Sequence, residues 1–220
     1  MTTPAVHALI PFGAVERAKT RLGAFLSPVQ RQTLAVAMLL DVISVLQTSS
    51  CVTSIAVIGP LSNRKILALP ADVRSLLEGK PTLNGAIAMA VRAIPAADTV
   101  LVIHADLPLL DAGDVDAFVR ATPADGVSLA KSADGGTPAI CSRIGAAWQW
   151  QFGPRSFFLH RDTASKTTVP YVVDDSSSLT HDVDTPEDLT SLDASACGSH
   201  TAAFLATVKR TYTPKPRRPS

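Results

Sequence analysis

Residues 99–108 read TVLVIHADLP, an apolar run that ends at a histidine, an aspartate and a proline. A short, continuous apolar run is typical of a parallel strand that is buried on both faces of a sheet. Pro108 restricts the path of the chain after the strand, so Asp106 is expected at the strand's carboxyl end. Ligands of open α/β sheets bind in the crevice outside that end. The run therefore predicts an α/β fold with Asp106 at its binding crevice.

Strand patterns alternate with helix patterns on both sides of this run. Ser27, Pro28 and Gln30 supply an N-cap, a first-turn proline and a capping-box partner, which predicts a long helix. Further strands are expected over residues 5–10, 54–58, 127–130, 137–141, 169–173 and 179–184. Further helices are expected over residues 83–94, 114–120 and 154–166, with a last one that begins at Thr185-Pro186. The alternation predicts a mostly parallel sheet.

The chain is expected to form one domain with an extension. No internal repeat and no second core pattern occurs, so residues 1–197 are assigned to the domain. The patterns weaken from Gly198 onward, which leaves residues 198–220 as a C-terminal extension. Residues 212–220 are rich in proline and arginine, a composition that favours disorder.

The composition excludes several classes of function. A net charge of +1 gives no broad cationic field, so neither nucleic acid nor an anionic membrane is expected as a partner. The three cysteines are widely spaced and form no CxxC pair, which favours a reduced compartment. No signal-peptide pattern is found at the N-terminus, and no apolar run approaches the roughly 20 residues of a membrane span. A cytoplasmic protein is therefore expected.

A group of cations follows the first expected strand. Arg17, Lys19 and Arg21 alternate in one loop, and cations at a strand's carboxyl end can surround a polyphosphate. The alternative is a solvated loop of mixed charge. Neither a GxGxxG motif nor a Walker A motif occurs, so a bound nucleotide would need a different phosphate site.

Carboxylates occur at two places that are far apart in the sequence. Asp182 and Asp184 alternate on the expected strand 179–184, from which either could meet Asp106 across the sheet. Mg²⁺ in nucleotide enzymes takes one or two carboxylates together with substrate phosphates. The alternative is that these aspartates only cap turns and helix ends. The sequence thus predicts a magnesium–triphosphate site and leaves open which late aspartate serves it.

Two glycine turns offer sites for a small anion. Residues 134–137 read DGGT and residues 152–156 read FGPRS, and such turns can present backbone N–H groups beside the hydroxyls of Thr137 and Ser156. The alternative is two ordinary loops. His104 and His160 are interpreted as a strand-end and a helix-surface residue. Trp148, Trp150 and Phe152 are interpreted as a packing cluster.

Several motifs together resemble one family. In order, they are ALIPFGAVERAKTRL (8–22), LNGAI (83–87), HADLPLL (104–110), GGT (135–137), FGPRSF (152–157) and DVDTPEDL (182–189). They resemble the CofC family of phospho-hydroxyacid guanylyltransferases, which act in the biosynthesis of the deazaflavin coenzyme F-420. AKTRL and ADLP are shared in looser form with other nucleotidyltransferases, whereas FGPxSF followed by DVDTPEDL is more specific. The resemblance covers about residues 5–193.

The resemblance implies a Rossmann-like, three-layer α/β/α nucleotidyltransferase fold and a transfer of GMP from GTP to a phosphorylated acid, with release of pyrophosphate. It implies catalytic roles for Lys19, Arg21 and Asp106. The implied nucleotide-binding residues are Pro11, Phe12, Lys19, Arg21, Leu83, Asn84, Gly85 and Asp106. The implied magnesium ligands are Asp106 with Asp182 or Asp184, and the implied acid-binding residues are Thr137, Gly153 and Ser156. The product would pass to a downstream deazaflavin transferase, and a homodimer is compatible with the family.

One departure from the family concerns the acceptor. Pro138 follows GGT, where a residue with a backbone N–H is usual, and proline removes that donor. The family implies 2-phospho-L-lactate, phosphoenolpyruvate or 3-phosphoglycerate as acceptors, and the changed donor set favours 3-phosphoglycerate. Two rival interpretations remain open: a nucleotidyltransferase for another phosphorylated group, of the molybdenum-cofactor type, and a catalytically silent nucleotide sensor.

Overall fold

The structure is a computed structural model that describes residues 4–65, 67–77, 82–96 and 98–211. Seven strands form one sheet in the order β3-β2-β1-β4-β6-β5-β7. Their bounds are β1 Val6–Pro11, β2 Ser54–Gly59, β3 Val73–Leu77, β4 Thr99–Ile103, β5 Val127–Ala130, β6 Ala139–Ser142 and β7 Tyr171–Asp174. All neighbouring pairs are parallel except those of β6, which runs antiparallel to both β4 and β5. The predicted α/β fold with a mostly parallel sheet is therefore confirmed.

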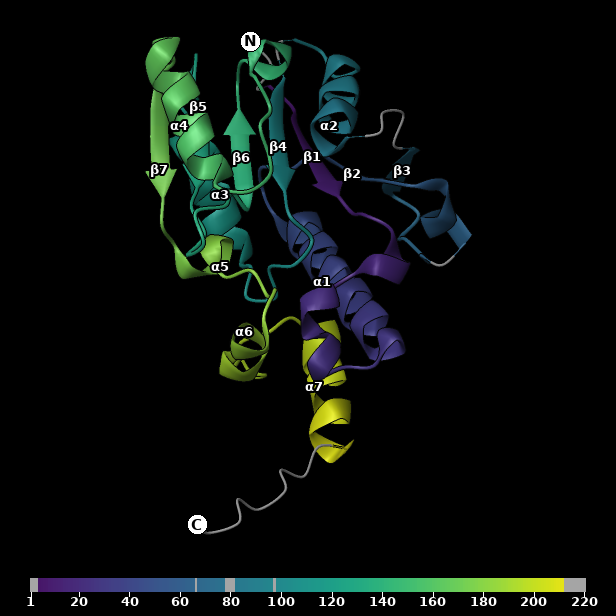
Figure 1. The fold of residues 1–220 in the computed structure, drawn as a ribbon. Helices are drawn as coiled ribbons and strands as arrows, with labels where there is room; N and C mark the ends of the chain where they lie inside the picture. The colour runs from purple at the N-terminus through teal and green to yellow at the C-terminus, as the bar shows by residue number, and fades with distance from the viewer. Residues whose placement is uncertain (1–3, 66, 78–81, 97, 212–220) are drawn as a thin grey trace, which may run out of the picture.

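Helices cover both faces of this sheet (Figure 1). Their bounds are α1 Pro28–Thr48, α2 Leu83–Arg92, α3 Ala112–Ala121, α4 Ser156–Lys166, α5 Ser177–Thr180, α6 Pro186–Ser191 and α7 Ser199–Thr211. Buried residues of β1, α1 and α3 form the core on one face, and buried residues of α2, α4 and the 148–152 segment form the core on the other. The result is the three-layer arrangement that the resemblance implies.

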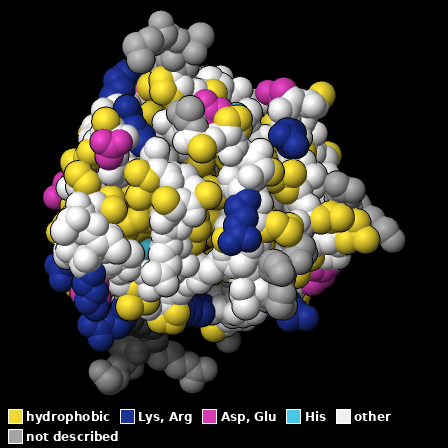
Figure 2. All heavy atoms as spheres, turned by 90° about the horizontal axis from the view of Figure 1, so that it is seen from above, with side chains coloured by type: hydrophobic (Ala, Val, Ile, Leu, Met, Phe, Trp, Pro, Cys, Tyr) yellow, Lys and Arg dark blue, Asp and Glu magenta, His cyan; other side chains and the backbone are white. Residues whose placement is uncertain are grey.

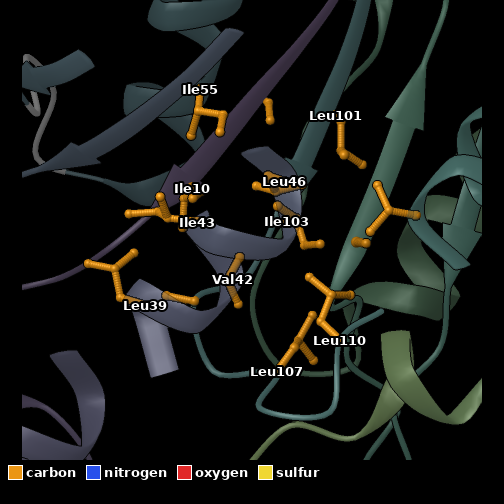
Figure 3. Packing of buried hydrophobic residues seen from close by; sticks show 14 of the residues in the cluster. Ile10, Leu39, Val42, Ile43, Leu46, Ile55, Leu101, Ile103, Leu107 and Leu110 are labelled. Atoms are coloured by element: carbon orange, nitrogen blue, oxygen red, sulfur yellow. The ribbon is translucent and has the colours of Figure 1, made fainter. Parts of the chain in front are cut away.

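Helix α1 packs against the centre of the sheet. Leu39, Val42, Ile43 and Leu46 are buried against strand residues such as Ile10, as Figure 3 shows. Ser27 accepts a hydrogen bond from the Gln30 backbone N–H, and the Gln30 side chain returns one to Ser27, so the predicted capping box is confirmed. At 21 residues α1 is long and apolar enough, by length and composition alone, to cross a membrane. Its apolar length instead serves the core.

Helix α7 adds a third apolar cluster where the sequence pattern weakens. Phe204 and Leu205 of α7 are buried together with Met38 of α1. The buried Asp41 carboxylate accepts hydrogen bonds from the backbone N–H groups of His200 and Thr201 and so caps the N-terminus of α7. Residues 199–211 therefore pack against α1, while the expectation of disorder for 212–220 lies outside the described residues.

The strand expected over residues 179–184 is wrong. Residues 177–180 form the short helix α5, and the chain then continues without a ladder until α6. Leu179 and Val183 are both fully buried, but in two different clusters, so their spacing imitates a strand. Helix α6 begins after Thr185 as expected, although α7 and not α6 is the last helix. The other predicted elements agree with the structure to within a few residues.

Charged side chains are mixed over the amino end of the parallel strands. Figure 2 shows this face, with lysine, arginine and acidic side chains interspersed rather than gathered by sign. This distribution agrees with the net charge of +1.

Candidate active site

The candidate site is a cleft at the carboxyl ends of β1 and β4. These two strands are neighbours, with Leu9 paired to Val102, so the loops that follow them lie side by side. The cleft has a volume of about 370 Å³. Its lining includes six of the residues implied in nucleotide or metal binding, namely Pro11, Phe12, Lys19, Leu83, Asp106 and Asp184, together with His104. The fold thus brings together residues from four distant parts of the sequence.

Lys19 lies at the centre of the charged groups. Its Nζ is 2.5 Å from Asp106 Oδ2 and 2.8 Å from Asp184 Oδ1, and its side chain is only 9% exposed. Burial disfavours the charged ammonium, but the two carboxylates outweigh this and raise the pKa of Lys19. Burial likewise opposes the charged carboxylate of Asp106, yet Lys19 holds the pKa of Asp106 below its usual value. Lys19 is therefore charged and fixed beside the cleft.

The backbone of Lys19 is strained. Its φ and ψ are 51° and 43°, the left-handed region that residues other than glycine rarely adopt. Such outliers cost about 1–3 kcal/mol and persist where the surrounding structure over-determines them. Here the ion pairs with Asp106 and Asp184 hold the residue in place.

A buried asparagine that the sequence analysis did not single out shapes the loop after β1. Asn63 Nδ2 donates to the carbonyl oxygens of Phe12 and Gly13, and Asn63 Oδ1 accepts from the Val15 N–H. A Cβ at Gly59 would lie 2.5 Å from the Phe12 oxygen, so only glycine permits this approach. Asn63 carries no motif of its own, and only the packing reveals its role.

Asp184 is positioned by the cap of α6. The Asp188 side chain accepts hydrogen bonds from the backbone N–H groups of Asp184 and Thr185. The neighbouring Val183 N–H donates to the carbonyl oxygen of Asp106. These contacts place the late aspartates beside Asp106, as predicted, although through an irregular segment rather than through a strand.

Arg21 lies at the rim of this group. Its Nη1 is 3.6 Å from Asp184 Oδ2, and its side chain is 70% exposed. It is therefore free to move toward a ligand. The charge of Arg21 also acts on Asp134, whose pKa is lowered mainly by hydrogen bonds from Ser132 and from the Gly136 backbone. Asp134 is a fourth carboxylate near the site that the sequence analysis assigned only to a turn.

Excess negative charge gathers around Asp182. Burial, followed by the charges of Asp106, Asp134 and Asp184, raises the pKa of Asp182 to about 7.

Asp106 Oδ1 is buried and has no hydrogen-bond partner in the part of the chain that the structure describes. A hard cation prefers such oxygens. No group of three potential metal ligands is found within the described ranges, and Mg²⁺ takes one or two carboxylates together with substrate oxygens. The residues present fit this ion.

The raised pKa of Asp182 predicts a pH-dependent stability. The folded state keeps a proton that the unfolded chain releases above pH ~4, so the wild type loses stability as pH rises from ~4 to about 7. In the absence of magnesium, Asp182→Asn is expected not to show this loss. The loss in the free energy of unfolding is about 1 kcal/mol after solvent screening, which corresponds to ~2–4 °C in Tm. Thermal unfolding of both proteins between pH 4 and pH 8 measures it. A difference in Tm that is the same at both ends of this range would contradict the expectation.

The resemblance implies nucleotide binding by three residues at the start of α2, namely Leu83, Asn84 and Gly85, and the structure divides them into two groups. Leu83 is exposed in the cleft. In contrast, the side-chain amide of Asn84 is already hydrogen-bonded to the backbone of Phe152. Its Nδ2 donates to the Phe152 carbonyl, and its Oδ1 accepts from the Phe152 N–H. Gly85 donates its N–H to the Thr82 hydroxyl, which caps α2. Asn84 thus ties the start of α2 to the 148–152 segment, and its contact with a nucleotide stays a prediction.

The implied acid-binding residues also lie close to one another. The Ser156 hydroxyl donates to Thr137 Oγ1 at 2.9 Å, and both residues are buried. Contrary to expectation, the turn N–H groups of Gly135 and Gly136 are not open, because they donate to Ser132 O and Asp134 Oδ1. Binding of an acid by Thr137, Gly153 and Ser156 therefore stays a prediction.

The interpretation of His160 as a helix-surface residue is wrong. His160 is fully buried in the core formed by α4 and the 148–152 segment, where its ring meets Phe152 edge-on at 5.2 Å. The interpretation of Trp148, Trp150 and Phe152 as packing residues is confirmed. His104 stands at the end of β4 and lines the cleft, and burial lowers its pKa.

Known proteins resemble this chain over nearly its whole length. Residues 6–219 match the family described as guanylyl transferase CofC like. A 3-phospho-D-glycerate guanylyltransferase from Phenylobacterium zucineum (strain HLK1) is 36% identical over 87% of this chain and 91% of its own length. A phosphoenolpyruvate guanylyltransferase from Sphaerobacter thermophilus is 34% identical, with coverages of 87% and 93%. A 2-phospho-L-lactate guanylyltransferase from Methanothermobacter thermautotrophicus is 33% identical, with coverages of 97% and 94%.

Solved structures of low sequence identity share the fold. A crystal structure from Desulfovibrio desulfuricans G20, described as a nucleotide-diphospho-sugar transferase, has a TM-score of 0.76 at 16% identity and covers 97% of this chain. A nucleotidyl transferase from Methanothermobacter has a TM-score of 0.58 at 16% identity and covers 92%. The cleft of this chain contains Lys19, Asp106 and Asp184. The chain is therefore a nucleotidyltransferase and belongs to the CofC-like guanylyl transferase family.

Proposed function

We propose that this enzyme transfers the guanylyl group of GTP to the phosphate of a small phosphorylated hydroxy-acid, with release of pyrophosphate. The observation that carries the proposal is the fixed Lys19 ammonium between Asp106 and Asp184 at the mouth of the cleft. A triphosphate needs both a cation and carboxylates that can share a metal at this position. The names of the relatives support GTP as the donor and a phosphorylated acid as the acceptor.

The chemistry requires positioning rather than a protein nucleophile. An oxygen of the acceptor phosphate attacks the α-phosphorus in line, a new P–O bond forms, and the bond to the β-phosphate oxygen breaks. Lys19 and Arg21 would bind the phosphates and stabilise the charge that develops on the leaving pyrophosphate. Asp106, with Asp182 or Asp184, would hold Mg²⁺, which when bound neutralises phosphate oxygens.

We further propose 3-phospho-D-glycerate as the preferred acceptor. Pro138 supports this choice because it removes a donor beside the acid-binding turn, and the Phenylobacterium relative bears this acid in its name. The relatives named for other acids are nearly as similar, so their identities do not decide the acceptor. The product would pass to a deazaflavin transferase in coenzyme F-420 biosynthesis. We place the enzyme in the cytoplasm, consistent with its three free cysteines.

Pro138→Asn is expected to change the acceptor preference. Pro138 is buried, and its carbonyl accepts the His104 N–H, so position 138 lies directly beside the cleft. Asparagine would restore a backbone N–H and add an amide. A hydrogen bond to a charged group is worth roughly 1.5–3 kcal/mol, so kcat/KM ratios should shift about tenfold to a hundredfold toward phospholactate or phosphoenolpyruvate. Competition assays that contain all three acids measure these ratios. Unchanged ratios would remove the argument from Pro138.

The proposed function is tested by product identification. The protein is mixed with GTP, magnesium and one of the three acids, the downstream transferase and its deazaflavin are added, and the product is identified by mass spectrometry. We expect the deazaflavin to acquire the acid, most strongly with 3-phospho-D-glycerate. Parallel reactions with a pterin phosphate and a sugar phosphate test the rival acceptors. Transfer to those acceptors alone would contradict the proposal.

A further inference from the structure

One buried imidazole connects the segments that the resemblance assigns to the acceptor. His160 of α4 is fully buried. Its Nε2 is 2.9 Å from the backbone nitrogen of Gln151, directly before the FGPRSF segment. Its Nδ1 is 3.1 Å from Thr137 Oγ1, in the turn that precedes β6. The side chain therefore ties α4 to both glycine turns.

These partners determine which nitrogen of His160 carries the proton. A backbone N–H can only donate, so Nε2 must accept from Gln151 and is unprotonated. Burial lowers the pKa of His160 to about 4, so the imidazole is neutral at pH 7 and its proton is on Nδ1. Nδ1–H then donates to Thr137 Oγ1.

Thr137 is left with one unused group. Its oxygen receives the His160 Nδ1–H, and when the Ser156 hydroxyl also donates to it, the Thr137 O–H is left to donate elsewhere. Thr137 is 1% exposed, and in that arrangement its O–H has no acceptor among the described residues. A buried donor without a partner costs free energy, which an oxygen of an incoming anion would recover.

Aromatic contacts hold the imidazole in this orientation. The rings of Trp148 and Phe152 both pack near the imidazole of His160, with centroids at 6.0 and 5.2 Å from it. Phe152 also meets the ring of His104, at 5.6 Å, and His104 lines the cleft. The network is thus rigid and borders the proposed active site.

We propose that His160 is a positioning residue that orients Thr137 as a hydrogen-bond donor to an anionic group of the acceptor acid. This inference rests on the proposed function and deepens it. It states toward which group the Thr137 O–H donates, and it assigns a positioning role to the buried His160. GTP binding is expected to depend on it far less, since neither His160 nor Thr137 belongs to the lining of the cleft that contains Lys19 and Asp184.

The test compares Thr137→Val, which keeps the shape, with Thr137→Ser, which keeps the hydroxyl, and His160→Phe with His160→Gln, whose amide can still accept a hydrogen bond. Pyrophosphate release is measured with the three acids and with GTP varied separately. Thr137→Val and His160→Phe are expected to raise the KM of the acid about tenfold to a hundredfold, with the KM of GTP and kcat within about threefold of wild type. Thr137→Ser should restore the wild-type value, and His160→Gln should recover part of it.

Thr163→Val is the matched control, because the Thr163 hydroxyl contacts the Gln151 side chain but not Thr137. It should leave the KM of the acid unchanged. Long-range ¹H–¹⁵N NMR of the wild type, without substrates, reports the tautomer of His160 and is independent of folding of the variants. A proton on Nε2, or an unchanged KM of the acid in Thr137→Val, overturns the inference while the proposed function stands. Absence of transfer by the wild type to any acid overturns both.

Discussion

Asp106→Asn is expected to lower turnover by at least ~1000-fold, about 4 kcal/mol in activation free energy, while the fold persists. Asp106 contributes the carboxylate beside Lys19 and a buried Oδ1 without a hydrogen-bond partner among the described residues, so the substitution removes a charge that a bound cation requires. Its side chain is partly exposed, and Lys19 retains Asp184 as a partner. The measurement is kcat with saturating GTP, acid and magnesium, together with thermal unfolding.

Asp162→Asn is the control for this substitution. Asp162 pairs with Lys166 on the exposed surface of α4 and does not line the cleft. Its substitution should therefore leave turnover unchanged. An Asp106→Asn enzyme within about tenfold of wild type would remove Asp106 from the mechanism.

Lys19→Ala is expected to reduce kcat/KM for GTP by ~100- to 1000-fold, or about 3–4 kcal/mol. The ammonium is already desolvated and oriented, so it can stabilise phosphate charge without reorganisation. Arg21→Ala should cost less, on the order of tenfold, because Arg21 is mostly exposed and its ion pair with Asp184 is long. In both variants the KM of the acid should change less than the KM of GTP, since a lost phosphate contact acts on the donor side.

Lys166→Ala provides the comparison for the loss of a lysine. Lys166 forms an exposed i,i+4 pair with Asp162, and such pairs contribute little. Initial rates over a grid of GTP and acid concentrations separate the two KM values. If Lys19→Ala changed both substrates equally, Lys19 would not be the phosphate-binding cation of this site.

The sequence predicts those features that local patterns report. The apolar run before Asp106 sets both the strand β4, which has the expected bounds, and the carboxylate at its end. In the structure β1 and β4 are neighbours, and the loops that follow them bring Lys19 into a contact with Asp106 that the sequence analysis did not predict. In these cases a single element positions each side chain.

Features that depend on several segments could not be predicted in this way. Burial of Leu179 and Val183 in separate clusters produced a false strand pattern. His160 looks polar and helical in sequence, and only the approach of Gln151 and Thr137 shows that its imidazole is buried and hydrogen-bonded. Asn63 likewise acts on a loop some fifty residues earlier in the chain.

Guanylyl transfer itself is measured most directly by ³¹P NMR of one reaction that contains the wild-type enzyme, GTP, magnesium and 3-phospho-D-glycerate. The account predicts that the signals of GTP and of the acid's phosphate monoester fall together. Those of a new diphosphate linkage and of inorganic pyrophosphate should rise in equal amounts, and none should appear when the acid is omitted. Formation of GDP and orthophosphate, or unchanged GTP with each of the three acids, would contradict it.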